Sequence, residues 1–219
     1  MQDKSKLIRR HETVHSSESL PIFRNISKVS RADRERLNNN KAFTIWLTGL
    51  SASGKSTIAN EIEYWIFGKG IRAYVLDGDN TRSGINKDLS FSDADRTENI
   101  RRIAEISKLF NDAGIIVISA LISPFAKDRL MARNIIGVDD FIEIFIDCSL
   151  TECINRDPKG LYKLALEGKI NDFTGVDSLY EPPESPDLHL QTDNNSIDDC
   201  VRLAKDYLIA KMTLAKIFN

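Results

Sequence analysis

The fold of this chain is decided by the stretch Phe43-Thr44-Ile45-Trp46-Leu47-Thr48-Gly49-Leu50-Ser51-Ala52-Ser53-Gly54-Lys55-Ser56. Its first six residues are almost continuously apolar, which is typical of a strand buried on both faces. Residues 49–56 match the pattern GxxxxGK followed by Ser or Thr, and Ile58, Ile62 and Ile66 then recur at helical spacing. A strand, a glycine-rich turn and a helix in this order present backbone N–H groups to an anion. The stretch therefore predicts a phosphate-binding loop.

The side chains of this loop predict a site for a nucleoside triphosphate with Mg²⁺. Lys55 is expected to reach the β- and γ-phosphates, and the Ser56 hydroxyl is expected to ligate the metal. The remaining loop residues would surround the phosphates with their N–H groups. The expected ATP contacts of the loop and the helix start are Gly49, Leu50, Ser51, Ala52, Ser53, Gly54, Lys55, Ser56 and Thr57.

Further apolar runs predict the other strands of the same sheet. They lie at Ile71–Leu76, Ile115–Ile122, Phe141–Ile146 and, more weakly, Asp187–Thr192. Helical patterns separate or follow them, from about Asp95 to Gly114, near Arg129 to Ile136, and from Ile197 to Leu208. Strands that alternate with helices in this way form a parallel sheet covered on both faces. Ligands of such sheets bind at the carboxyl ends of the strands, where Gly49–Ser56, Asp77–Arg82, Ser123 and Asp147 should converge.

The chain length of 219 residues fits one domain with a tail. Residues 1–41 contain ten Lys and Arg against five Asp and Glu, so they are expected to form a basic, partly flexible arm. Within it, Arg31 to Leu37 predicts a short helix that docks on a neighbour or on the body. Residues 42–219 are expected to form the phosphate-binding domain.

Composition excludes several classes of protein. The net charge of −2 argues against a nucleic-acid partner, and no run of 18 apolar residues could span a membrane. The N-terminus lacks the apolar region of a secretory signal. Cys148, Cys153 and Cys200 are an odd number without CxxC spacing, so reduced, semi-buried thiols in a cytoplasmic protein are expected.

The loop alone does not say which reaction follows, so other signatures must decide. A GTPase would need Asn-Lys-x-Asp after a later strand; residues 86–89 read Asn-Lys-Asp-Leu and come too early. A motor ATPase would need a pair of acids after a strand, whereas Asp147 is followed by Cys148. The class that remains is a small phosphotransferase with an acceptor beside the loop.

Residues after the second strand are candidates for the acceptor side. Asp77 and Asp79 suit magnesium-water positioning or acceptance of a hydroxyl proton, and they suit equally a turn capped by Asp and Asn. Arg82 and Arg96 could form forks for phosphate or sulfate, whereas Arg101 and Arg102 are expected on a solvated face.

The segment 156–184 is long, polar and punctuated by Gly and Pro between two predicted strands. Such a length inside one domain usually belongs to a functional lid. A basic lid that closes would keep water away from the phosphoryl group.

From about Asn25 to Leu208 the chain resembles the adenylylsulfate kinase family. The matching motifs are residues 49–56, Leu-Asp-Gly-Asp-Asn at 76–80, Phe-Ser-Asp-Ala-Asp-Arg-Thr-Glu-Asn-Ile-Arg-Arg at 91–102, Ile-Ser-Pro at 122–124, Arg-Asp-Pro-Lys-Gly-Leu-Tyr-Lys at 156–163, and Phe-Thr-Gly-Val-Asp at 173–177. The resemblance implies a three-layer P-loop NTPase-type α/β fold with a five-stranded parallel sheet. It also implies transfer of the ATP γ-phosphoryl group to the ribose 3′-hydroxyl of adenosine 5′-phosphosulfate (APS) in sulfate activation, giving 3′-phosphoadenosine 5′-phosphosulfate (PAPS) and ADP.

The resemblance also assigns roles to residues. Lys55, Asp77 and Ser123 are the implied catalytic residues, with Ser123 either carrying a phosphoryl group or orienting phosphate. Ser56 and Asp77 would hold Mg²⁺, Arg156 would bind ATP, and the APS adenine would lie between Phe91 and Phe173. The implied substrate-binding residues are Asp79, Asn80, Arg82, Phe91, Arg96, Asn99, Ile122, Lys163 and Phe173.

The family pattern is met with small departures, at Thr81, Ser83 and Ser90. A stand-alone kinase is expected, as a homodimer, with ATP sulfurylase as a functional partner. Two alternatives remain: another small P-loop kinase, of the nucleoside monophosphate or shikimate type, and a catalytically idle nucleotide-binding regulator. The intact Lys55, Ser56, Asp77 and Arg82 argue against the regulator.

Overall fold

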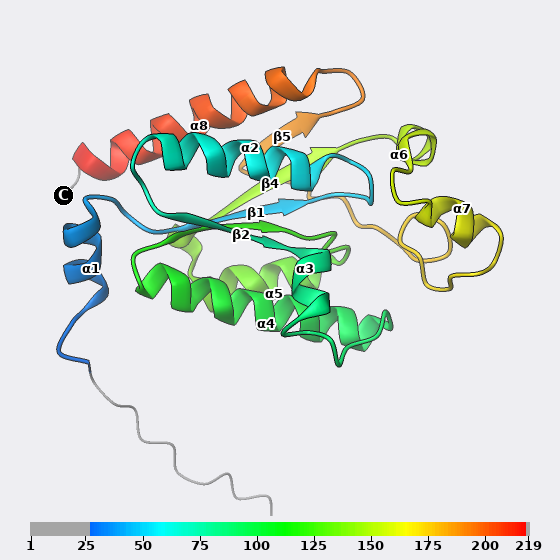
Figure 1. Cartoon of the computed structure of the whole chain (residues 1–219), viewed down its shortest axis with the longest axis horizontal. Coiled ribbons are helices and arrows are strands. Elements are labelled where there is room, and N and C mark those ends of the chain that lie inside the picture. The colour runs from blue at the N-terminus through cyan, green and yellow to red at the C-terminus, as the bar shows by residue number, and fades with distance from the viewer. Residues whose placement is uncertain (1–26, 218–219) are drawn as a thin grey trace, which may run out of the picture.

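The computed structural model describes residues 27–217 and is built on a five-stranded parallel sheet (Figure 1). The strand order is β2-β3-β1-β4-β5. The strands are β1 (Thr44–Thr48), β2 (Ala73–Asp77), β3 (Ile116–Ala120), β4 (Phe141–Asp147) and β5 (Leu188–Gln191). The predicted sheet of five parallel strands is confirmed.

Strand β1 lies in the centre of the sheet, and all five of its residues are therefore buried. Ile45 pairs with Ile118 of β3 and with Ile142 of β4, so apolar side chains align across the sheet. Successive side chains point to opposite faces of a strand. Ile45 and Leu47 therefore enter one core, while Trp46 enters the other.

Helices cover both faces of the sheet, as predicted (Figure 1). On one face α2 (Lys55–Gly68) and α8 (Ile197–Ile217) pack on the first core. On the other face α4 (Asp93–Asp112) and α5 (Ala126–Ile136) pack on the second core. A short 3-10 helix, η1 (Val138–Asp140), leads into β4. No helix in the described part of the chain is long and apolar enough to cross a membrane.

The helix predicted in the basic arm is present as α1 (Arg31–Asn38), and it docks on the body of the same chain. Arg31 pairs with Asp140, and Arg34 donates to the carbonyl of Asp112 at 3.0 Å. Asn38 Nδ2 donates to the carbonyl of Gly114 at 2.9 Å. Residues 1–26 of the arm lie outside the described residues, so the expected arm and its boundary remain predictions for them.

Three short helices at the carboxyl edge were not predicted: α3 (Gly78–Ser83), α6 (Leu150–Arg156) and α7 (Leu161–Leu166). Asp77 caps α3, since its Oδ1 accepts from the N–H of Asp79 at 3.0 Å. The predicted strand Ile115–Ile122 is too long. Strand β3 ends at Ala120, and the chain then turns so that Ser123 has a φ of 40°.

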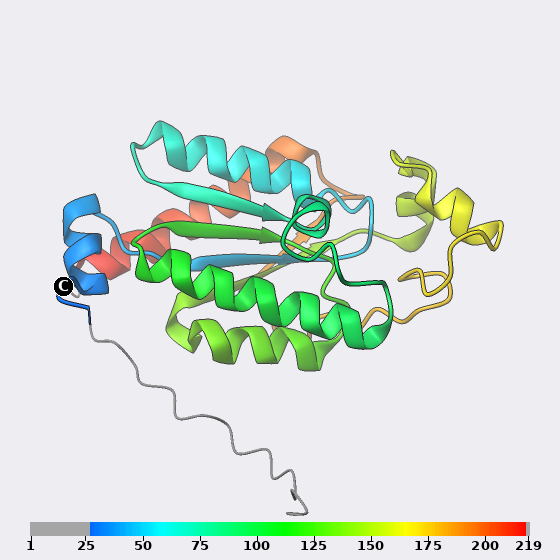
Figure 2. The ribbon, with the colours of Figure 1, turned by 60° about the horizontal axis from the view of Figure 1, so that its bottom comes forward.

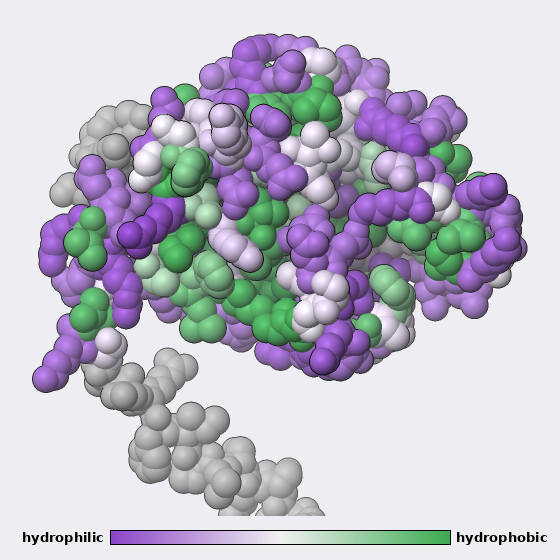
Figure 3. Space-filling model, in the orientation of Figure 1, coloured by the Kyte–Doolittle hydropathy of each residue, from purple (hydrophilic) through white to green (hydrophobic). Residues whose placement is uncertain are grey.

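The edge strand β2 carries apolar residues to the surface. Tyr74 packs against Phe110 with ring centroids 5.5 Å apart, and Leu109 beside it is exposed. Figure 3 shows apolar residues among polar ones on the face with β2 and α4. The N–H of Val75 donates to Glu63 Oε1 at 3.0 Å, so a side chain of α2 blocks part of the open edge.

The loops that follow the strands gather at one end of the sheet. Figure 2 shows the strand arrows pointing to the end where the segment of α6 and α7 lies. Asp147 reaches this edge but pairs with His189 at 2.8 Å and does not line the cavity described below. The three cysteines are free and buried, which fits the predicted reduced thiols.

The docking of α1 predicts an unequal pair of glycine substitutions. Gly114 and Gly70 both have positive φ, of 80° and 72°, but a Cβ on Gly114 would lie 2.7 Å from Asn38 Nδ2, whereas one on Gly70 meets nothing within 4 Å. Both alanine variants should lose about 1 kcal/mol to backbone strain. Gly114→Ala should lose about 1 kcal/mol more, because it breaks the contact with Asn38. Urea unfolding measures both, and equal losses would contradict the close docking of α1.

Candidate active site

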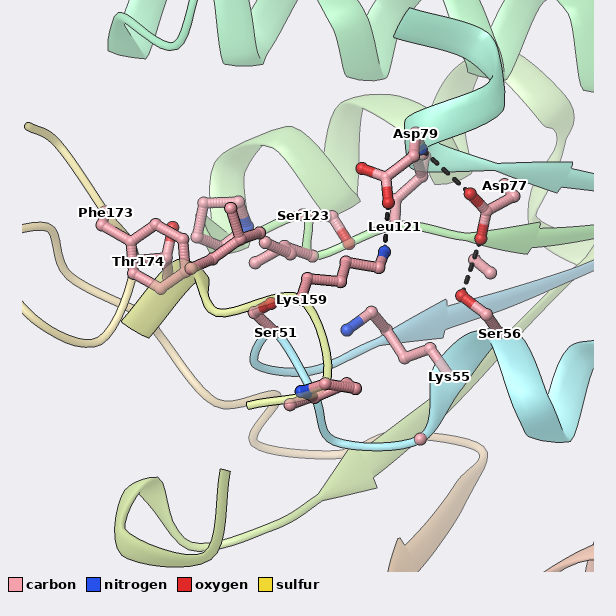
Figure 4. A pocket seen from close by; sticks show the side chains of 18 of the residues that line it. Ser51, Lys55, Ser56, Asp77, Asp79, Leu121, Ser123, Lys159, Phe173 and Thr174 are labelled. Carbon is pink, nitrogen blue, oxygen red and sulfur yellow. Dashed lines mark hydrogen bonds and ion pairs between the residues drawn. The ribbon is translucent and has the colours of Figure 1, made fainter. Parts of the chain in front are cut away.

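A cavity of about 1000 Å³ opens at the carboxyl edge of the sheet. Its volume lies at the upper end of the range for small-molecule sites. The loop after β1, helices α3 and α4, and the segment 156–174 surround it (Figure 4). The predicted site residues that line it are Ser51, Ala52, Gly54, Lys55, Ser56, Thr57, Asp77, Asp79, Arg82, Phe91, Arg96, Asn99, Ile122, Ser123, Arg156 and Phe173.

The loop owes its shape to close packing and to positive φ angles. A Cβ on Gly49 would lie 2.3 Å from the carbonyl oxygen of Ile146, so only glycine fits there. Ala52 and Gly54 have φ angles of 61° and 104°, which turn the chain back on itself before α2 begins at Lys55. The loop thus presents its backbone N–H groups next to the positive amino end of α2, where an anion can bind.

Lys55 is buried beneath the loop. Its Nζ donates to the carbonyl oxygens of Gly49 at 2.9 Å and of Leu50 at 2.5 Å. Burial lowers the pKa of Lys55 to about 8, and within the described residues it forms no ion pair with a carboxylate. Its Nζ also donates to Ser53 Oγ at 3.4 Å, so all of its partners are uncharged oxygens. A buried cation held by uncharged oxygens is suited to an anion that approaches from the cavity.

Ser56 and Asp77 meet at the start of α2 (Figure 4). Ser56 Oγ donates to Asp77 Oδ2 at 2.7 Å, and the other oxygen of Asp77 is held by the N–H of Asp79. A hydroxyl and a carboxylate are hard oxygen ligands of the kind that Mg²⁺ takes together with phosphate oxygens and water. The pair therefore fits the predicted metal.

Arginines and an aromatic ring stand opposite the loop. The Arg82 guanidinium lies over the Phe91 ring, 4.4 Å from its centroid, and donates to the Ser90 carbonyl at 2.8 Å. Arg96 donates to the Phe91 carbonyl at 2.9 Å and to Thr174 Oγ1 at 3.2 Å. Burial lowers the pKa of both arginines, and the charge of Arg96 also lowers that of Arg82. An anion between them would relieve both effects.

The segment that was predicted to be a lid touches both sides of the cavity. Tyr162 is buried, donates to the Ser51 carbonyl at 3.1 Å, and meets the Phe173 ring edge-on at 5.0 Å. Lys159 pairs with Asp79 of α3 (Figure 4). Arg156 donates to the Thr192 carbonyl at 2.6 Å. Whether this segment opens and closes remains a prediction.

Some predicted residues do not reach the cavity. Gly49, Leu50 and Ser53 form the back of the loop, so only their neighbours line the cavity. Asn80 is exposed on α3, and Lys163 is exposed on α7 one residue after the buried Tyr162. Their roles in substrate binding remain predictions without support from this geometry.

Arg101 and Arg102 lie outside the cavity on the outer face of α4, as predicted. Arg101 pairs with Glu98 at 2.7 Å, and Arg102 pairs with Glu98 and Asp88 at 2.8 Å. These two arginines are matched by carboxylates, whereas Arg82 and Arg96, which line the cavity, have no carboxylate partner among the described residues.

Sequence reasoning missed several residues that line the cavity. Lys159 is the most informative, because its position between Pro158 and Gly160 in the predicted lid was a signal that could have been used. Thr174 and Leu121 were missed because their positions follow from turns that the sequence does not announce. Residues 192 and 195–197 come from the connection between β5 and α8 and from the first residue of α8, and they line the cavity.

The loop between β1 and α2, the strand order β2-β3-β1-β4-β5 and the cations opposite the loop together define a P-loop kinase.

Comparison with known proteins identifies the family within this class. Residues 41–191 match the family described as adenylylsulphate kinase, and the chain belongs to that family. It is 52% identical over 183 residues to the adenylyl-sulfate kinase of Pseudomonas entomophila (strain L48), covering 84% of this chain and 88% of that one. It is also 52% identical over 171 residues to the probable adenylyl-sulfate kinase of Bacillus subtilis (strain 168), covering 78% and 86% of the two chains.

A solved structure supports the same assignment. The Mycobacterium tuberculosis APS kinase CysC, in complex with AMPPNP and APS, is 48% identical with a TM-score of 0.74, covering 77% of this chain and 98% of that one. The resemblance found in the sequence and the predicted P-loop kinase fold are both confirmed.

The burial of Lys55 predicts proton uptake when a triphosphate binds. Phosphate charge should raise the pKa of Lys55 from about 8 toward its ordinary value. Above about pH 8 the protein should therefore bind one proton with ATP, and its affinity should fall as pH rises. Calorimetry at about pH 9, in buffers of different ionisation enthalpy, measures the uptake.

The matched control is Lys55→Arg, because a guanidinium stays charged throughout this range. An arginine variant that binds ATP should show no proton uptake from this position. Wild-type heats that do not depend on the buffer would contradict the lowered pKa of Lys55.

Proposed function

We propose that the protein transfers the γ-phosphoryl group of ATP to the ribose 3′-hydroxyl of APS, giving PAPS and ADP. The observation that carries this proposal is that one cavity joins the phosphate-binding loop to Phe91, Phe173, Arg82 and Arg96. The family and the relative that holds AMPPNP and APS support the same reaction.

The acceptor lies between the aromatic side chains and the arginines. Phe91 is 57% exposed and lines the cavity, and Phe173 of the lid segment lines it too. Stacking between two rings suits an adenine. The Arg82 and Arg96 charges suit the phosphosulfate group. Arg96 also holds Phe91 and residues 172–174 in place, since its donors bind their backbone and Thr174.

The donor lies in the loop, with its triphosphate along residues 49–56 and its base toward Arg156 and residues 192–197. Lys55 binds the phosphates that meet the acceptor. Mg²⁺, held by Ser56 and Asp77 with the phosphates, would neutralise charge on the β- and γ-phosphates.

The chemical step needs positioning more than covalent chemistry. The acceptor oxygen forms a bond to the γ-phosphorus as the bond to the β,γ-bridging oxygen breaks, and ADP leaves. Asp77 orients the 3′-hydroxyl and accepts its proton. Lys55 stabilises the charge on the transferring phosphoryl group, while the lid residues exclude water.

Ser123 acts by orienting phosphate in this proposal. It is 2% exposed, and its Oγ accepts a hydrogen bond from the Trp46 indole at 3.1 Å. That donor draws electron density from the oxygen, and no described His or carboxylate hydrogen-bonds to the hydroxyl to remove its proton. A nucleophilic serine needs such a base. Direct in-line transfer therefore fits this environment better than a phosphoserine intermediate.

Ser123→Ala separates the two mechanisms. Turnover should fall by about ten-fold or less, because one hydrogen bond to phosphate is lost. The turnover of Lys55→Ala should fall by at least about a hundred-fold, because a charge that stabilises the transition state is lost. Steady-state assays measure both. A Ser123→Ala enzyme without turnover, together with a wild-type phosphoserine labelled from γ-³²P-ATP, would favour the relay.

An acceptor panel tests the function itself. With ATP and Mg²⁺, the protein should phosphorylate APS, and AMP and shikimate should react poorly, because neither presents both a 3′-hydroxyl and a sulfated phosphate. ADP release and product mass are measured, with Lys55→Ala as the inactive control. Efficient phosphorylation of AMP or shikimate without APS turnover would assign the chain to another kinase type. Absence of turnover with any acceptor would favour the idle regulator.

The assembly and partners expected from the resemblance stay with this proposal. A homodimer and a functional link to ATP sulfurylase, whose product would be the acceptor, remain predictions.

A further inference from the structure

Asn86 is a buried polar residue that neither the loop nor the acceptor site uses directly. It lies in the connection between α3 and α4 and is 0% exposed. Its N–H donates to the Thr81 carbonyl at 2.9 Å, and its carbonyl accepts from the N–H of Leu89 at 3.1 Å. Both backbone bonds hold the residue in place, so its side chain has a defined direction.

That side chain contacts a residue of the acceptor site. Asn86 Nδ2 donates to Asn99 Oδ1 at 2.9 Å. Asn99 is 5% exposed, sits on α4 and lines the cavity. Its Nδ2 has no hydrogen-bond partner within the part of the chain that the structure describes, and it is not one of the fully buried atoms that lack a partner. The NH₂ group of Asn99 therefore faces the cavity.

The orientation of the amide pair is the favourable one. As it stands, Asn86 Oδ1 is buried without a partner. If both amides were turned over, the NH₂ group of Asn86 would be buried without a partner instead. Buried N–H groups without partners are rarer in proteins than buried carbonyl oxygens without partners. The two amides therefore keep one orientation, in which Asn99 Oδ1 accepts from Asn86 and the NH₂ group of Asn99 points toward the cavity.

We propose that Asn86 is a positioning residue that fixes the amide of Asn99 with its NH₂ group toward the acceptor nucleoside. The site then selects a ligand with a lone-pair atom at this place, such as a ring nitrogen or a ribose oxygen of adenosine. The inference rests on the proposed function for the identity of this ligand. It adds a residue that sets specificity without touching the substrate.

Asn86→Asp tests the direction of the amide. A carboxylate at position 86 can only accept, so Asn99 must turn its NH₂ group inward and present its oxygen to the ligand. At neutral pH the dissociation constant and KM for APS should rise by about ten-fold. The KM for ATP should stay within about two-fold, because the loop is unchanged.

Lowering the pH should rescue this variant. A protonated carboxyl group at position 86 can donate to Asn99 Oδ1 again, and burial raises the pKa of such a group. The affinity for APS should therefore recover toward the wild-type value as the pH falls. Asn60→Asp, the same change on the exposed face of α2, controls for the added charge and should show no such recovery.

Calorimetry with ADP in the donor site gives the dissociation constants, and the coupled assay gives KM. Asn86→Ala removes the anchor without adding charge and should raise the dissociation constant less than Asn86→Asp does. If the aspartate variant does not fold, the dissociation constant of Asn86→Ala for APS tests the inference instead. Wild-type affinity for APS in folded Asn86→Ala and Asn86→Asp proteins would overturn the inference, as would a defect in Asn86→Asp that does not depend on pH.

The two proposals fail in different ways. A wild-type protein that binds APS without phosphorylating it would contradict the proposed function alone, since the dissociation constants still report on Asn99. A wild-type protein that does not bind APS would contradict both.

Discussion

The close approach of Gly49 to β4 is the constraint on which the site depends. Parallel pairing of β1 and β4 brings the backbone at Gly49 so near to the Ile146 carbonyl that a Cβ would lie 2.3 Å from it. The chain can then turn through Ala52 and Gly54 and enter α2 at once. The result places the amino end of a helix, a buried lysine and the Ser56 hydroxyl at the carboxyl edge of the sheet. The central strands β1, β3 and β4 are buried on both faces, so this edge cannot easily shift.

Charge in the cavity is arranged to be completed by a ligand. Outside it, Arg101 and Arg102 are matched by Glu98 and Asp88. Inside it, Arg82 and Arg96 have aromatic and carbonyl partners but no carboxylate within the described residues, and Lys55 bonds to carbonyls. Burying charge without a counter-charge costs stability, and a polyanionic ligand removes that cost on binding. Two anionic nucleotides in one cavity are therefore chemically consistent with its walls.

Local patterns in the sequence predicted the sheet, the loop and most of the residues that line the cavity opposite the loop. From Phe43 to Ile66 the spacing of apolar residues, the turn glycines and the motif all indicate the same strand, loop and helix. They did not predict α3, since Gly78-Asp79-Asn80 has the composition of a turn, nor α6 and α7, which flank Pro158 and Gly160. Contacts between distant residues were also out of reach. The Lys159–Asp79 pair joins segments 80 residues apart, and the environment of Ser123 depends on Trp46 from another strand.

The residues proposed to bind the acceptor also contact one another. Arg96 binds the Phe91 carbonyl on one side and Thr174 on the other, so the ring on the α4 side and the lid segment share one guanidinium. Tyr162 links the Phe173 ring to the Ser51 carbonyl of the loop. Because the predicted lid segment contacts both Arg96 and the loop, its closure would bring the proposed acceptor site at Phe91 and Phe173 and the proposed phosphate site into register. In-line transfer requires that register, since misplacement by about 1 Å costs a hundred-fold in rate.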